Sequence, residues 1–154
     1  RSSDLLSLVV ADPDPWVRCA ALRSLGKIGG EVALTAIAHA LDGADSLVFL
    51  AALDALRAFN TDRSRELARR ATTNDDGDVV KVAIEILAEA GDPWLADHVE
   101  EFLGHPHWDV RNTVVRHLAE TCGRAALPLL RSALERETDD LVKGRIVDIL
   151  ERFR

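Results

Sequence analysis

The chain repeats itself every 31 residues, and this period constrains the fold more than any other feature. A period of about 20 to 50 residues indicates stacked helical or strand units, because each unit can bury its apolar face only against its neighbours. Four columns run through five copies without an insertion, and Arg145 is the single residue in them that is not apolar. The columns are Val17, Val48, Val79, Val110 and Leu141; Ala21, Ala52, Ala83, Val114 and Arg145; Leu22, Leu53, Ile84, Val115 and Ile146; and Leu25, Leu56, Leu87, Leu118 and Ile149.

The spacing inside each copy predicts an α-helix. In the first copy the apolar residues fall at i, i+4, i+8 and i+11, which is one face of a helix, and they are Val17, Ala21, Leu25 and Ile28. The position three before the first column offers side chains that can accept hydrogen bonds from the first turn: Asp14, Asp45, Asp76, the weaker His107, and Thr138. The far end offers residues that tolerate a left-handed conformation: Gly29, Asn60, Gly91 and, after Cys122, Gly123.

A second apolar helix follows in each copy. It is marked by Leu34, Ile37 and Leu41; by Arg65, Ala68 and Thr72, the weakest set; by Ala96, Val99 and Leu103; and by Leu127, Leu130 and Leu134. Residues 2–10 look like the second helix of an earlier unit. We therefore predict ten helices in an all-α, right-handed α-solenoid of about five helix pairs. Residues 1–154 are expected to form a single repeat domain that is a segment of a longer protein.

The charge and the cysteines exclude several classes of protein. Acidic residues outnumber basic ones by 26 to 19, and the net charge of -7 argues against general binding to nucleic acid or anionic membranes. No segment approaches the roughly 20 apolar residues of a membrane span. Cys19 and Cys122 form no C-x-x-C pair, so neither a disulfide framework nor a zinc ribbon is indicated.

Two segments of the chain carry a family resemblance. DPWVRCAALRSLGKIG, which starts at Asp14, resembles the short HEAT-like repeat first noted in phycobilisome lyases, and HPHWDVRNTVVRHLAETCG is a second match. The resemblance covers nearly the whole chain and implies an armadillo-like superhelix. Phe49, Val80 and Val142 replace the arginine found at Arg18 and Arg111, so contacts between neighbouring units that use this arginine would be interrupted in the middle.

The same resemblance points to a working surface on the first helices. Positions 16, 20, 23 and 27 lie opposite the buried stripe, and in this repeat type the equivalent helices resemble those lining a concave groove. An alternative is that Trp16 and Leu47 pack against the loops between units. The candidate partner-binding residues are Trp16, Arg23, Lys27, Leu47, Leu50, Asp54, Lys81, Glu85, Trp108, Asn112 and Arg116.

Other arrangements of reactive side chains suggest no chemistry. His105, His107, Asp109 and His117 do not converge on a metal, because His117 lies about 15 Å along the helix from His107. Neither cysteine has a neighbouring base, and Gly29-Gly30 is a turn rather than a phosphate loop. We therefore expect no catalytic residue, metal or cofactor. The only basic cluster is expected to be a solvated helix face: Arg57, Arg63, Arg65, Arg69 and Arg70.

These observations favour a non-catalytic, cytoplasmic scaffold that binds another protein or a peptide in its concave groove. The family resemblance leaves two alternatives open. One is a bilin lyase-like or chaperone-like subunit that acts on a tetrapyrrole-binding protein. The other is a DNA-lesion binder, which is disfavoured because the groove would carry five basic and eight acidic side chains.

Overall fold

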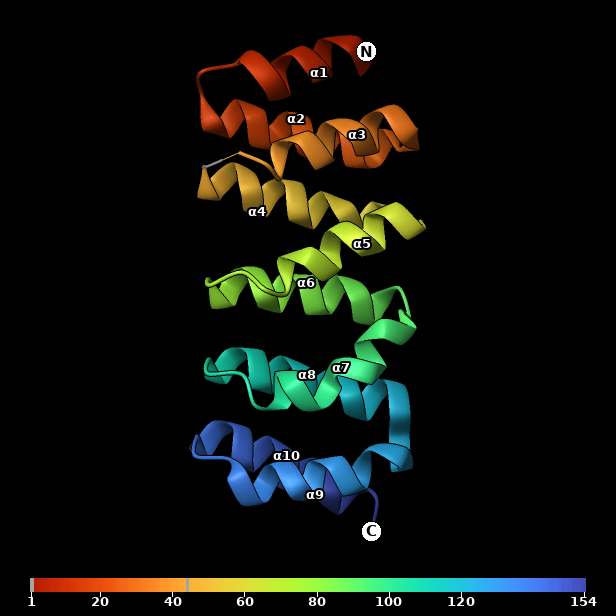
Figure 1. The fold of residues 1–154 in the computed structure, drawn as a ribbon, viewed down its shortest axis with the longest axis vertical. Coiled ribbons are helices and arrows are strands. Elements are labelled where there is room, and N and C mark those ends of the chain that lie inside the picture. The colour runs from red at the N-terminus through yellow and green to blue at the C-terminus, as the bar shows by residue number, and fades with distance from the viewer. Residues whose placement is uncertain (1, 44) are drawn as a thin grey trace. The chain divides into compact units, whose positions relative to one another are not determined.

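The computed structural model describes residues 2–43 and 45–154, apart from the side chains of residues 2, 3, 5, 7 and 10 (Figure 1). This described part of the chain is helical and contains no strand. The contacts divide the chain into two compact units, Arg1–Thr73 and Asn74–Arg154, here called unit 1 and unit 2. Within each unit the helices stack in pairs, so the predicted all-α solenoid class is confirmed.

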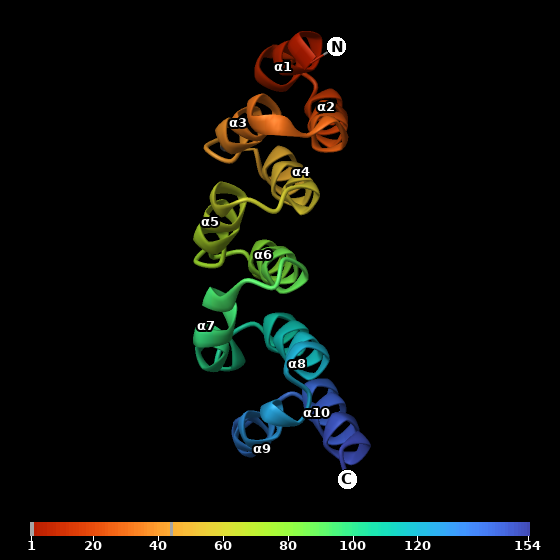
Figure 2. The same ribbon diagram turned by 90° about the vertical axis from the view of Figure 1, so that its right-hand side faces the viewer.

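Unit 1 consists of two layers of helices. Its elements are α1 (Ser2–Ala11), α2 (Pro15–Ile28), α3 (Gly30–Ala40), α4 (Ser46–Ala55), the 3-10 turn η1 (Leu56–Ala58) and α5 (Asp62–Ala71). The first helices α2 and α4 lie side by side, and the second helices α3 and α5 form the other layer (Figure 2). Helix α1 packs against α2 and α3. The side chains that fill the space between the layers include Leu22, Leu25, Leu34, Ile37, Leu53 and Leu56, all fully buried.

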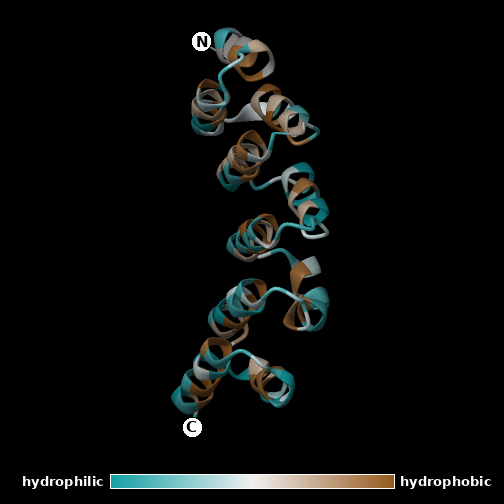
Figure 3. Ribbon diagram, turned by 90° about the vertical axis from the view of Figure 1, so that its left-hand side faces the viewer, coloured by the Kyte–Doolittle hydropathy of each residue, from teal (hydrophilic) through white to brown (hydrophobic). Residues whose placement is uncertain are grey.

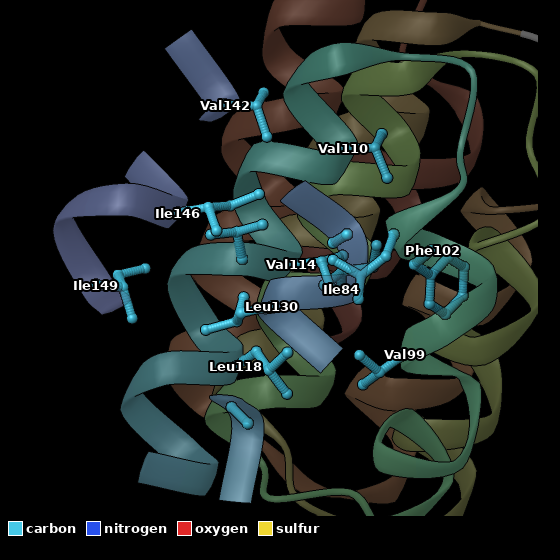
Figure 4. Close-up of a cluster of buried hydrophobic side chains, with 14 of the residues drawn as sticks. Ile84, Val99, Phe102, Val110, Val114, Leu118, Leu130, Val142, Ile146 and Ile149 are labelled. Carbon is cyan, nitrogen blue, oxygen red and sulfur yellow. The ribbon is translucent and has the colours of Figure 1, made fainter. Parts of the chain in front are cut away.

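Unit 2 has the same two-layer arrangement. Its elements are α6 (Gly77–Glu89), α7 (Pro93–Leu103), α8 (Trp108–Cys122), the 3-10 turn η2 (Gly123–Ala126), α9 (Leu127–Arg136) and α10 (Asp140–Arg152). Helices α6, α8 and α10 form one layer, while α7 and α9 form the other (Figure 2). Each of these helices carries both apolar and hydrophilic residues (Figure 3). The apolar ones join in a buried cluster that includes Ile84, Val114, Leu118, Leu130 and Ile146 (Figure 4).

Most helix caps lie at the residues that the sequence predicts. The carboxylates of Asp14, Asp45 and Asp76 accept hydrogen bonds from backbone N–H groups of the first turns of α2, α4 and α6. His107 precedes α8 but makes no side-chain cap, in line with its weaker prediction. Gly29 has a φ of 74° at the end of α2, a conformation that residues with a Cβ rarely adopt.

Two predicted helix ends are wrong. Asp139, and not Thr138, caps α10, because its Oδ1 accepts hydrogen bonds from the N–H groups of Leu141 and Val142. Helix α10 therefore buries Val142 and leaves Leu141 70% exposed. Asn60 is not left-handed, since no residue other than glycine has a positive φ in the described part of the chain. Helix α4 ends earlier, at Ala55, and continues into η1.

The last position of the predicted apolar stripe in α2 is also wrong. Ile28 is 53% exposed although the periodicity places it on the buried face. It is the final residue of α2, and the neighbouring helix α4 ends at Ala55, before the position that corresponds to Ile28. The end of α2 therefore extends past the last residue of α4.

The start of α6 fits tightly against the turn before α8, and this contact gives a first prediction. Gly77 is buried, and a Cβ placed on it would lie 2.6 Å from Cγ of His107. We expect Gly77→Ala to lower the free energy of unfolding by about 1–3 kcal/mol, because the imidazole ring has to move. Urea unfolding followed by circular dichroism measures this loss.

The matched control removes the ring. In a His107→Ala background the same Gly77→Ala change should raise stability by about 0.4–1 kcal/mol, because alanine reduces the entropy of the unfolded chain. Gly77 can accept a Cβ there, since the glycines with positive φ in the described residues are Gly29, Gly30, Gly91 and Gly123. An equal loss in both backgrounds would show that the contact with His107 is not the cause.

Candidate functional site

Helix α2 presents an aromatic side chain and two cations to solvent. Trp16 is 68% exposed at the start of the helix, where its backbone N–H is held by Oδ1 of Asp14 at 2.9 Å. Arg23 and Lys27 follow on the same face and are also exposed. Neither cation forms an ion pair with another residue that the structure describes. This surface, together with Leu47, Leu50 and Asp54 of α4, is called the unit 1 patch below.

The α4 side of the unit 1 patch is less exposed. Leu47 and Leu50 are half-buried, while Asp54 is exposed and accepts a hydrogen bond from Nε of Arg57 at 2.7 Å. The thiol of Cys19 donates to the carbonyl oxygen of Leu47 at 3.6 Å, which ties α2 to the first turn of α4. The two leucines therefore contribute to packing in unit 1, whereas Trp16 stands clear of it.

The corresponding surface of unit 2 is held by polar contacts between successive helices. Nζ of Lys81 lies 2.9 Å from Oδ2 of Asp109, and Nη2 of Arg116 lies 3.7 Å from Oε1 of Glu85, so both contacts join α6 to α8. The hydrogen bond with Asp109 raises the pKa of Lys81 above its ordinary value and outweighs the opposing effect of burial. Four of the five candidate residues in unit 2 thus bond to other residues of the chain: Lys81, Glu85, Asn112 and Arg116.

Arg145 explains the one exception among the apolar columns. Its Nε donates a hydrogen bond of 2.7 Å to Oδ1 of Asn112 and joins α8 to α10. Sequence reasoning noticed this residue but did not give it a partner. The sequence did contain a signal for this contact, which is a single polar residue in an otherwise apolar column. A half-buried guanidinium needs a hydrogen-bond acceptor, so such a residue predicts an acceptor on a neighbouring helix.

Thr113 also corrects the sequence analysis. Thr113 lies three repeats after position 20 of the exposed stripe, so the periodicity predicts that it is exposed, yet it is 2% exposed. Its Oγ1 donates to the carbonyl oxygen of Asp109 at 2.8 Å, which satisfies the hydroxyl within its own helix. The exposed stripe of α8 is therefore narrower than predicted.

The three tryptophans lie in different environments. Trp108 is 41% exposed at the start of α8. Trp94 lies in the first turn of α7, and its ring stacks on His98 with 4.0 Å between the centroids. It also contacts Phe102, so its role is packing within unit 2. Trp16 is the most exposed of the three, and it shares a face of α2 with Arg23 and Lys27, which form no ion pair among the described residues.

The family model for HEAT repeats matches residues 2–57 and 64–151. The chain belongs to the HEAT repeat family. The break between the matched ranges covers the end of η1 and the start of α5, where the repeat pattern is weakest. HEAT repeats commonly mediate protein–protein interactions. The match is to HEAT repeats in general, so the resemblance to the phycobilisome-lyase type stays a prediction. The search of curated proteins found no match.

The turn between α7 and α8 of these HEAT repeats is organised by Arg111. Its Nη1 donates to the carbonyl oxygens of His105 and Pro106 at 2.7 and 3.1 Å, and its Nε and Nη2 donate to the carboxylate of Glu137. Burial, followed by the positive charges nearby, lowers the pKa of His105. Nδ1 of His105 accepts a hydrogen bond from the backbone N–H of His107.

Within the described residues no group of three or more His, Cys, Asp or Glu side chains is placed to hold a metal ion.

The two thiols of the HEAT repeats should differ in reactivity. Cys19 is buried, and burial raises the pKa of its thiol, whereas Cys122 is exposed at the end of α8. Because the thiolate is the reactive form, we expect iodoacetamide at pH 8 to modify Cys122 at least tenfold faster than Cys19 in the folded protein. Mass spectrometry of peptides from timed samples measures both rates. Equal rates in the folded protein would contradict the buried position of Cys19.

No helix in the described residues is long and apolar enough to cross a bilayer.

Proposed function

We propose that these HEAT repeats form a non-catalytic scaffold that binds a protein or peptide segment through the unit 1 patch. The observation that carries this proposal is that the exposed ring of Trp16 lies on the same face of α2 as Arg23 and Lys27. Tryptophan and arginine are the residue types that most often supply binding energy in protein interfaces. A cytoplasmic location is part of the proposal and agrees with two cysteines that form no disulfide with each other.

The chemistry of the unit 1 patch defines the partner. Arg23 and Lys27 favour carboxylates on the partner, because opposite charges steer and align two surfaces. Trp16 favours an apolar side chain. The distance along α2 from Trp16 to Lys27 is about 16 Å at 1.5 Å per residue. We propose a segment with an apolar anchor at one end and acidic residues within about 16 Å of it.

The candidate residues of unit 2 have a secondary role in this proposal. Lys81, Glu85 and Arg116 already form ion pairs between α6 and α8. A partner that used these groups would have to replace existing contacts, which reduces the gain in binding free energy. Trp108, at 41% exposure, is the remaining aromatic contact that unit 2 offers.

No observation supports the two alternatives, the DNA-lesion binder and the subunit that acts on a tetrapyrrole-binding protein. A DNA binder needs many basic side chains that are available for phosphates, but three of the four arginines of α5 bond to acidic side chains of unit 1. These pairs are Arg63 with Glu31, Arg65 with Asp62, and Arg70 with Glu66. The tetrapyrrole alternative rests on the family resemblance alone.

Peptide selection on the whole chain tests the proposal. We expect a random 12-residue library to yield acidic peptides that contain at least one large apolar residue. These peptides should bind at least tenfold more weakly to the Arg23→Glu, Lys27→Glu variant. The matched control, Arg131→Glu with Arg136→Glu, makes the same change in net charge on exposed positions of α9 and should bind normally. Equal losses in both variants would mean that only the overall charge matters, and the unit 1 patch would then be the wrong site.

A further inference from the structure

Unit 2 contains an apolar pocket that none of the candidate partner-binding residues lines. It lies between α6, α7 and α8 and has a volume of about 310 Å³. Its floor is made of core side chains, among them Leu87, Val99 and Leu118, which are at most 6% exposed. Because the floor belongs to the core between two helical layers, an occupant would extend the core of unit 2 rather than lie on its surface.

The 31-residue repeat explains why the pocket exists. Position 96 of α7 corresponds to Leu34 of α3 and Leu127 of α9, whose side chains are 1% and 8% exposed and fill the core at those places. Ala96 lacks these atoms and lines the pocket. A side chain that packs the core in the first and fourth copies is therefore missing in the third, and the pocket opens at that point.

The volume limits the size of an occupant. A protein cavity of about 150 Å³ with apolar walls takes up benzene, and ligand pockets begin at about 300 Å³. The pocket of unit 2 has about twice the volume of the benzene cavity, which suits two fused aromatic rings. A peptide segment of several residues is too large for it.

The rim limits the charge of an occupant. The polar residues that line the pocket are Asp92, His117, Thr121 and Cys122, and no lysine or arginine is among the lining residues that the structure describes. Nδ1 of His117 lies 3.6 Å from a carboxylate oxygen of Glu120. An anionic ligand would bring a second negative charge to a pocket that Asp92 already lines, while Arg116 lies outside the lining and contacts Nε2 of His117 at 3.5 Å. A neutral ligand with one hydrogen-bonding group would avoid this cost.

We propose that the pocket between α6, α7 and α8 binds an uncharged two-ring aromatic molecule that carries one hydrogen-bonding group. The rings lie against the core side chains of the floor, and the polar group lies at the rim beside His117 and Thr121. This site is independent of the proposed partner-binding role of the unit 1 patch.

The test uses 1-aminonaphthalene, an uncharged fluorescent probe of this size, on the whole chain at pH 7. We expect a saturable change in emission with one site per chain and a Kd on the order of 100 μM. The anion 1-naphthoate should bind at least tenfold more weakly. If there is no saturable change, or if naphthoate binds as tightly, the proposed class of ligand is wrong.

Ala96→Leu supplies the decisive variant, because it restores the residue type of Leu34 and Leu127. It should fold with an unchanged or raised melting temperature and weaken probe binding at least tenfold. Ala125→Leu adds the same atoms at an exposed position of η2 outside the pocket and should bind normally. Undiminished binding to a folded Ala96→Leu variant would overturn the proposal.

A second measurement decides the question even if Ala96→Leu fails to fold. Cys122 lines the pocket, so bound 1-aminonaphthalene should slow its alkylation in the wild-type protein. At a probe concentration of ten times Kd we expect a reduction of at least threefold. If Cys122 reacts at the same rate with and without the probe, the bound molecule is elsewhere and the proposed site is wrong.

Discussion

Arg111→Met is expected to lower the free energy of unfolding by about 3–5 kcal/mol, the largest effect of any single substitution considered for this chain. Arg111 and Glu137 form an ion pair whose side chains are only 14% and 3% exposed, with 2.9 Å between Nη2 and Oε1. Methionine leaves the carboxylate of Glu137 buried without its cationic partner, which is the costly way to break a buried pair. It also releases the carbonyl oxygens of the turn before α8. Urea unfolding at pH 7 measures the loss.

The pH dependence of this effect follows from Glu137. Burial by itself raises the pKa of this carboxyl, but hydrogen bonds from Arg111 and from the backbone N–H of Asp139 lower it below the ordinary value of 4.5. A lowered pKa in the folded state contributes stability that is complete above pH 4.5 and is lost as the pH falls through the folded pKa. We therefore expect the difference between the wild type and Arg111→Met to shrink below pH 4.5. A difference that stayed constant down to pH 3 would exclude this ionisation as the source.

A double variant shows how much of the stability lost in Arg111→Met comes from the broken ion pair and how much from other changes in the turn before α8. In the Arg111→Met, Glu137→Gln protein, the new amide side chain would keep an oxygen that accepts from the backbone N–H groups of Thr138 and Asp139, which Oε1 of Glu137 bonds at 3.2 and 3.1 Å. Because it removes the buried charge, the double variant should recover at least half of the stability lost in Arg111→Met. Losses that simply add would show that the two side chains are not coupled.

Trp16→Ala is expected to weaken binding of a selected acidic peptide by about 2 kcal/mol, or roughly 30-fold. The same substitution should change the free energy of unfolding by less than about 0.5 kcal/mol, because the ring is 68% exposed. Isothermal titration and thermal melting measure the two quantities. A sharply lowered melting temperature would show that the ring belongs to the core of unit 1.

Two further alanine variants serve as comparisons. Leu50 is half-buried in α4, so Leu50→Ala should lower the melting temperature as well as the affinity. Trp108 is exposed in unit 2, where the proposal gives it a secondary role, so Trp108→Ala should change the affinity less than threefold. If Trp108→Ala weakened binding as much as Trp16→Ala, the unit 1 patch would not be the main site.

The helices could be predicted from the sequence because their signals are local. A strict period, an aspartate before α2, α4 and α6, and a glycine at the end of α2 specify most of the fold without any long-range information. The start of α10 was missed because Thr138 and Asp139 are both suitable caps and lie next to each other. The choice of Asp139 shifts the buried face by one residue and exposes Leu141.

The candidate site could be predicted only in part. Helical periodicity correctly places Trp16, Arg23 and Lys27 on an exposed face, since it depends on one helix alone. It says nothing about which side chains of two neighbouring helices reach each other. Lys81 and Asp109, which form an ion pair, are 28 residues apart in the chain. Whether they reach each other depends on the length of both side chains and on the distance between α6 and α8.

The most direct test of the proposed function is the ¹⁹F NMR spectrum of the whole chain labelled with 5-fluorotryptophan. The chain has three tryptophans, so three resonances are expected, and the one that disappears in Trp16→Phe belongs to Trp16. On saturation with a selected acidic peptide, the Trp16 resonance should shift or broaden while that of Trp94, which packs on His98, stays in place. A saturated complex in which the Trp16 resonance does not move would contradict binding at the unit 1 patch.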